Sequence, residues 1–186
     1  MNELILSKLD VGKSSLGVTP NAHGGGFPAA CLQTSVDKVG GVIETTVLVD
    51  LAQGAGGGGT AGDIIGTDND ATLGGAYIAQ LTEAVNGVVF ACEISCLQLP
   101  EGSDPDINVV FSATADDAHD AGVTAGTVLV DEGDLTLGQS DKHPVGATIM
   151  AGGINALPYV YLTNGVATDA AYTAGKLVIT FYGARF

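Results

Sequence analysis

The last segment of the chain, Tyr172–Phe186, alternates between two kinds of side chain at every second position. Leu177, Ile179 and Phe181 would share one face, and the positions between and beside them carry lysine, valine, threonine and tyrosine. This period of two, built from β-branched and aromatic residues, predicts a strand with one buried face. Because chain ends fray unless something holds them, we expect this strand to be held in a sheet or against a partner.

Short segments of the same character recur along the chain, and no stretch sustains the 3.6-residue period of an amphipathic helix. In Val42–Leu51 every second position from Ile43 onward is aliphatic or threonine, whereas Glu44 and Asp50 fall on the other face, which we expect to be wet. The pattern predicts an all-β fold, either an antiparallel β-sandwich or a jelly-roll-like domain, and leaves the strand order open. The other expected strands are Cys31–Val36, Val88–Leu99, Ile107–Phe111, Val128–Val130, Leu135–Leu137 and Pro158–Thr163.

A hairpin is expected in the middle of the chain. Its first strand would be Tyr77–Val85 and its turn Asn86-Gly87, a pair that suits a two-residue turn with positive φ at both positions. A helix over Tyr77–Val85 is the alternative. In the second strand of the hairpin, one face would carry Phe90, Cys92, Ile94 and Cys96.

The first part of the chain differs in composition from the rest. Residues 1–30 are rich in Gly, Ser and Asn and contain Pro20 and Pro28, so they predict an extended N-terminal arm, and residues 31–186 predict the β-sandwich domain. The arm would lie on a neighbouring subunit or remain a solvated tail. The run His23–Gly26 matches the glycine-rich oxyanion loop of some esterases, but no G-x-S-x-G motif accompanies it, so we interpret it as a bend. Gly54–Asp70 is expected to be a flexible loop.

The charge of the chain excludes several classes of partner. Asp and Glu total 21 and Lys and Arg total 6, which gives a net charge of −15. Binding to nucleic acid or to an anionic membrane surface requires basic residues, so neither is expected. No stretch approaches the roughly 18 apolar residues of a membrane span. Charged residues are only 15% of the chain and Gly numbers 28, so we expect a lightly charged surface that packs into a homo-oligomer.

The cysteines are expected to be buried, reduced thiols. Cys92 and Cys96 share a predicted strand, which separates them by roughly 13 Å. A disulfide requires Cα atoms within about 7 Å of each other. Reduced thiols are consistent with synthesis in a cytoplasm.

Acidic loops are the only candidates for a bound ion. Asp116, Asp117 and Asp120 lie close together in a predicted loop, and converging carboxylates bind Ca²⁺ in other proteins. The alternative is that Asp simply favours turns. No Ser–His–Asp set, carboxylate pair or Cys–His pair is recognisable, so no enzyme activity and no other cofactor are expected.

Two segments, Leu16–Val36 and Tyr159–Phe186, resemble small structural proteins of tailed bacteriophages, particularly marine ones, of the capsid decoration or cement type. The resemblance implies synthesis in a host cytoplasm and a final place on the exterior of the virion capsid. There the protein would bind the major capsid protein and lock neighbouring shell subunits. Such proteins are commonly trimeric and are not enzymes.

On this interpretation the arm would contact the shell, and the end of the terminal strand would lie at a subunit boundary. Alternatives are another assembly role, as a main shell, tail, fibre or filament subunit, and a carbohydrate-binding β-module. The candidate contact residues are Leu4, Ile5, Leu6, Leu9 and Phe27 in the arm, and Tyr182, Arg185 and Phe186 at the C-terminus.

Overall fold

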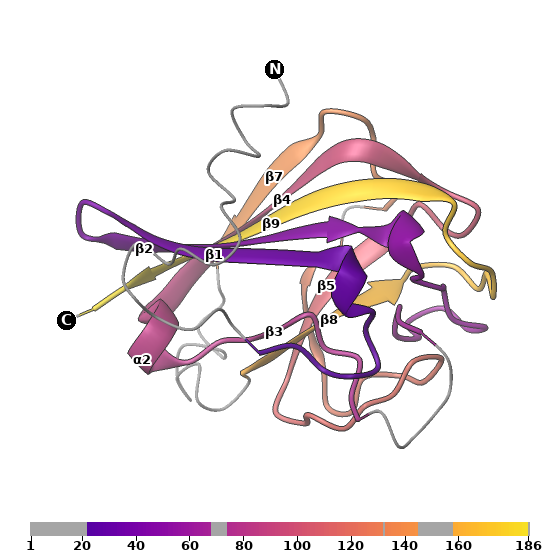
Figure 1. The fold of residues 1–186 in the computed structure, drawn as a ribbon, viewed down its shortest axis with the longest axis horizontal. Coiled ribbons are helices and arrows are strands. Elements are labelled where there is room, and N and C mark those ends of the chain that lie inside the picture. The colour runs from indigo at the N-terminus through magenta and orange to yellow at the C-terminus, as the bar shows by residue number, and fades with distance from the viewer. Residues whose placement is uncertain (1–21, 68–73, 132, 145–157, 186) are drawn as a thin grey trace.

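Two antiparallel β-sheets pack against each other in the computed structural model, which describes residues 22–67, 74–131, 133–144 and 158–185 (Figure 1). One sheet has five strands in the order β1-β2-β9-β4-β7, and the other has four in the order β3-β8-β5-β6. The predicted all-β sandwich is confirmed. The strands are β1 (Leu32–Val39), β2 (Val42–Asp50), β3 (Ala79–Gln80), β4 (Val88–Glu101), β5 (Ile107–Ser112), β6 (Thr127–Val130), β7 (Ser140–Pro144), β8 (Tyr159–Asn164) and β9 (Ala174–Ala184). The short helical segments are η1 (Ala29–Cys31), η2 (Leu51–Gln53) and α2 (Glu83–Asn86).

The strand pairing is nested. β2 pairs with β9, β3 with β8, β4 with β7 and β5 with β6, all antiparallel. Two further pairings, β4 with β9 and β5 with β8, complete the sheets. The eight strands β2–β9 therefore pair from the outside of the sequence inward, β2 with β9 first and β5 with β6 last, and they are divided between two sheets. This topology is a jelly roll. β1 is an additional strand that lies outside β2 in the five-stranded sheet.

The core lies between the two sheets and follows the predicted alternation. Along β9 every second residue is buried over the whole strand, and Leu177, Ile179 and Phe181 have no exposed surface. The Phe181 ring packs edge-on against Phe111 of the opposite sheet, with 6.0 Å between ring centroids. On β2 the predicted inner face is buried, from Ile43 to Val49. These inward side chains hold the two layers together.

The predicted hairpin at Asn86-Gly87 is wrong. β3 and β4 belong to different sheets, and Glu83–Asn86 form the helical turn α2 between them. The Asn86 side chain accepts a hydrogen bond from Thr82 N (2.7 Å) and donates one to the buried Thr45 hydroxyl (2.7 Å). Because this buried amide is hydrogen-bonded in the helical turn, we attribute the turn to tertiary contacts that override the local preference of Asn-Gly. The helical alternative is therefore correct for the last part of the segment.

One side chain of β4 faces the opposite way from the prediction. The pairing of β4 with β9 shifts register between Val89 and Ala91, which marks a β-bulge. The extra residue buries Val89 and leaves Phe90 40% exposed, whereas Cys92 and the alternate residues after it face the core as predicted.

The seventh strand was not expected where it lies. The predicted strand Leu135–Leu137 is a loop in which Leu135 alone is buried, and β7 follows at Ser140–Pro144. β7 is a polar edge strand with intermediate and exposed residues only. A strand without an apolar face has no periodic signal in the sequence.

Residues 22–27, the part of the predicted arm that precedes η1, are built into the domain. Gln80 N donates to Ala22 O (2.8 Å) and Gly24 N donates to Tyr77 O (2.9 Å), so this segment runs beside β3. Phe27 is only 1% exposed and belongs to the core. Phe27 therefore packs inside this chain, and its role as a capsid or subunit contact stays a prediction. The other predicted arm contacts, Leu4, Ile5, Leu6 and Leu9, lie outside the described residues.

Several glycines permit close contact between backbones rather than flexibility. A Cβ atom on Gly24 would lie 1.7 Å from Gly75 O, and one on Gly75 would lie 1.7 Å from Ala115 O. The expected flexible loop is likewise hydrogen-bonded, because Gly56 and Gly66 exchange backbone hydrogen bonds of 2.7 and 3.1 Å. Only glycine allows chain segments to stack at these distances.

We predict that Phe27→Ala lowers the free energy of unfolding by about 3–5 kcal/mol, because it leaves a cavity in the core. Urea denaturation followed by circular dichroism would measure the loss. Leu137→Ala is the control, since Leu137 is 67% exposed and its truncation should change stability by less than about 0.5 kcal/mol. Equal effects of the two substitutions would show that Phe27 is not a core residue.

We predict that Gly24→Ala destabilises the domain by about 1–3 kcal/mol or more, because the added methyl group meets backbone atoms that have no room to move. Gly41→Ala is the matched control, since a Cβ atom there would have no neighbour within 4 Å. Thermal unfolding of both variants tests the prediction. It fails if Gly24→Ala melts with the control.

Candidate interaction surface

Most residues on the outer face of the five-stranded sheet are partly or fully exposed. Its residues alternate with the buried ones, and the strand register aligns five of them in a row across the sheet. All five side chains are partly or fully exposed. The row is Ser35, Thr46, Thr180, Glu93 and Lys142. The face is therefore broad, polar and built from mostly short side chains, which leaves it accessible to a partner protein.

Glu93 is the centre of a polar network on this face. It accepts hydrogen bonds from the Tyr182 hydroxyl (2.7 Å) and the Ser140 hydroxyl (2.8 Å). The Lys142 Nζ atom lies 3.6 Å from the centre of the Tyr182 ring, a cation–π contact. The hydrogen bond from Tyr182, with those of Ser140 and the charge of Lys142, holds the pKa of Glu93 below its usual value, although burial opposes the shift. The network ties β4, β7 and β9 together.

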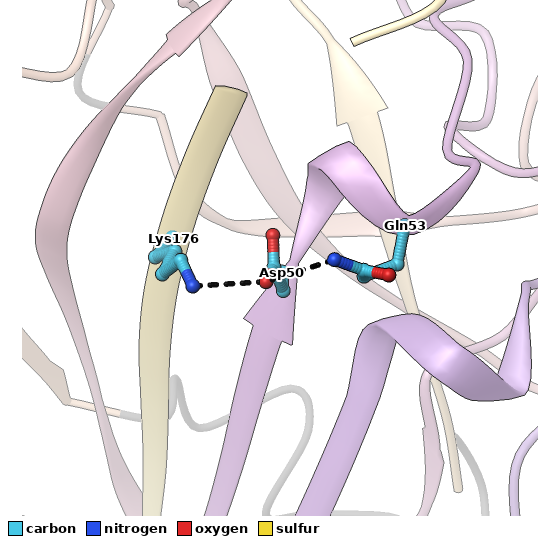
Figure 2. A network of polar contacts seen from close by, with 3 residues as sticks. All are labelled: Asp50, Gln53 and Lys176. Carbon is cyan, nitrogen blue, oxygen red and sulfur yellow. Dashed lines mark hydrogen bonds and ion pairs between the residues drawn. The ribbon is translucent and has the colours of Figure 1, made fainter. Parts of the chain in front are cut away.

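An ion pair links strands at the other end of the same face (Figure 2). Lys176 Nζ on β9 lies 2.9 Å from Asp50 Oδ2 at the end of β2, and the Gln53 amide of η2 donates to the same oxygen at 3.5 Å. Because Lys176 is 46% exposed, the pair contributes at most about 1 kcal/mol. It connects β9 to the residue that precedes η2.

The predicted C-terminal contact residues lie at or near this face. Tyr182 is partly exposed in the Glu93 network, and Arg185 follows the end of β9. The Arg185 guanidinium donates a hydrogen bond to the Ala84 carbonyl of α2. Both side chains therefore already have a partner within the chain, and their role at a subunit boundary stays a prediction. Phe186 lies outside the described residues.

The three aspartates considered as calcium ligands do not form one site. Asp117 is buried and accepts hydrogen bonds from the Thr124 backbone N (2.9 Å) and hydroxyl (2.7 Å). Asp120 accepts from Gly59 N at 2.6 Å, and Asp116 is exposed. Within the described ranges, no three His, Cys, Asp or Glu side chains gather as a metal site. Asp117 and Asp120 order their loops, as the turn interpretation expects.

A second acidic region was not apparent from the sequence. The loop after β4 and the loop after β6 meet through a backbone bridge between Asp106 and Asp134. Burial raises the pKa of Asp106, and the charges of Asp104, Asp131 and Asp134 raise it further. These residues come from two separate segments of the chain, so spacing along the sequence gives no sign that they meet.

Exposed aliphatic side chains flank the junction of β4 and β7. Leu97, Leu99 and Leu137 are all exposed, and Gly138 N donates to Cys96 O at 2.9 Å, which brings the loop before β7 beside the end of β4. Three leucines are therefore exposed near the β7 edge of a chain whose net charge is −15.

The three cysteines are free and buried, as predicted. Burial raises the pKa of the Cys31 thiol to about 11 and also raises the pKa of Cys96. Protonated thiols of this kind act as small apolar side chains and are poor nucleophiles.

No protein-family model and no curated protein matches the chain. Among the described helices, none is long and apolar enough to cross a membrane.

We predict that Glu93→Gln lowers the free energy of unfolding at pH 7 by about 1 kcal/mol, because it replaces the carboxylate that accepts two hydrogen bonds with a neutral amide. Since folding lowers the pKa of Glu93, its stabilisation is present above the unfolded pKa and disappears as the pH falls through the folded value. The wild type and the variant should therefore converge once the pH falls below the folded pKa of Glu93.

Urea titrations at neutral and acid pH test this prediction. Glu101→Gln is the control, because the Glu101 side chain is exposed. A difference between wild type and Glu93→Gln that is the same at neutral and acid pH would contradict the network's role.

Proposed function

We propose that this chain is a non-enzymatic structural protein of a virion, a decoration protein that binds the outer surface of a capsid shell. The observation that supports it most is the nested strand order of the domain. Jelly rolls recur in viral capsid proteins, and also in lectin domains and cupins. This argument is one of analogy between folds, since a fold by itself does not define a function.

Charge and surface favour the outside of a shell over the other assembly roles. A net charge of −15 disfavours the inner face, where packaged nucleic acid would repel it. The open face of the five-stranded sheet and the exposed leucines beside β7 supply surface for shell subunits and for further copies of the chain in a homo-oligomer. The major capsid protein is the expected partner.

Carbohydrate binding is the second candidate, because jelly rolls include lectin domains. Tyr182 and Glu93 place an aromatic ring and a carboxylate together on an open face, and sugars are bound by such pairs. However, Lys142 Nζ already lies over the Tyr182 ring at 3.6 Å, where a sugar would stack. A glycan array with wild type and Tyr182→Ala tests this candidate directly.

Cosedimentation with shells tests the decoration role. Empty heads assembled from the major capsid protein of the same genome would be mixed with the full chain and with a chain lacking residues 2–21. The deletion stops there because residues 22–27 belong to the folded domain. We predict that the full chain sediments with the heads, and that the deletion weakens binding at least about tenfold without changing the melting temperature.

A variant with Leu4, Ile5, Leu6 and Leu9 all changed to Ala should reproduce the loss, and Ser14→Ala with Ser15→Ala is its matched control. A full chain that does not sediment with heads rules out the decoration role. Shells or fibres formed by the purified chain alone, seen by electron microscopy, would support the alternative assembly roles instead.

A further inference from the structure

The two sheets have four edge strands, and three of them are short or protected. β3 has two residues and residues 22–26 hydrogen-bond along the adjoining segment, β6 has four residues, and β7 is polar and ends in Pro144. Such features keep an edge from pairing with another chain. The fourth edge strand, β1, differs from these three.

β1 is longer and more regular than these three strands, although it carries one charged residue of each sign, Asp37 and Lys38. It has eight residues, contains no proline, and pairs with β2 in eight consecutive register positions without a bulge. Among the described strands, β2 is its only neighbour in the sheet. A long, regular edge presents a row of backbone donors and acceptors on which another strand can add.

We propose that β1 pairs antiparallel with β1 of a second copy of this chain, which joins the two five-stranded sheets edge to edge. A strand that pairs with its own copy about a twofold axis needs no second type of surface, because the interface is the same patch on both subunits. This interface does not depend on the proposed binding to a capsid.

The side chains of β1 favour one register. A twofold axis perpendicular to the sheet keeps outer side chains opposite outer ones, as in the pairing of β1 with β2. If the axis passes through Val36, then each Ser35 hydroxyl faces the Asp37 carboxylate of the other copy, and the buried Val36 side chains extend the inner row that Val36 forms with Thr45. An axis through Asp37 would instead oppose two carboxylates.

The charge of β1 also favours a second copy at this edge. The strand carries one acid, Asp37, and one base, Lys38, so it is neutral, whereas the whole chain carries −15. The strand itself therefore adds no net charge repulsion between two copies.

Analytical ultracentrifugation of the full chain tests the pairing. We predict a monomer–dimer equilibrium that Ser35→Asp weakens at least about tenfold, because residue 35 then faces Asp37 of the other copy, carboxylate against carboxylate. Thr46→Asp is the control, since it adds the same charge on the same face one strand further in. Circular dichroism and thermal unfolding show that each variant folds.

A charge exchange tests the register. Adding Asp37→Ser to Ser35→Asp restores a hydroxyl opposite a carboxylate, so we predict that the double variant dimerises like the wild type. Hydrogen exchange of the β1 amides should slow as protein concentration rises. The proposal is overturned by a monomer at all concentrations, by a trimer, by a dimer that Ser35→Asp leaves unchanged, or by a dimer that is lost when residues 2–21 are deleted.

Discussion

The structure depends on the place of β9 between β2 and β4. The last strand of the chain pairs over most of its length with both neighbours, so the five-stranded sheet is joined only through it. Its inward residues Leu177, Ile179 and Phe181 are fully buried, and Phe181 reaches Phe111 in the opposite sheet. Strands that lie far apart in the sequence therefore come together around β9, and the five-stranded sheet is complete only when β9 is in place. This arrangement gives the contacts a high sequence separation, which is typical of slowly folding β-proteins.

The loops are held by buried polar groups and by close backbone contact. Asn164 is fully buried, and its amide donates to the carbonyl oxygens of Gly58, Thr60 and Val166. The Tyr172 hydroxyl donates to Asp104 O at 2.9 Å. Glycine allows these segments to approach one another, and each buried donor is satisfied by a carbonyl that would otherwise need water. The Gly-rich loops are therefore hydrogen-bonded to the rest of the domain.

The candidate site could be predicted only in part. Tyr182 is recognisable because it lies in a clearly alternating strand, but its partners Glu93, Ser140 and Lys142 come from two other strands, and only the register brings them together. The calcium hypothesis relied on residues close in sequence, yet Asp117 and Asp120 turn toward Thr124 and Gly59. Asp106 meets Asp134 instead, across a gap in sequence that no local pattern reveals. Side-chain partners on a sheet are set by strand neighbours, and the sequence does not state which strands are neighbours.

The sequence by itself determined the class of fold and the buried face of the strongest strands. Period-two alternation in β2 and β9 reports directly which side chains avoid water, and this local signal needs no knowledge of the partner strand. Only the tertiary structure decided the nested strand order, the helical turn at Asn86 and the bulge that exposes Phe90. It also decided that Phe27 belongs to the core. Each of these features depends on residues that are distant in the sequence. Such long-range partners leave no signal in the local periodicity of the sequence.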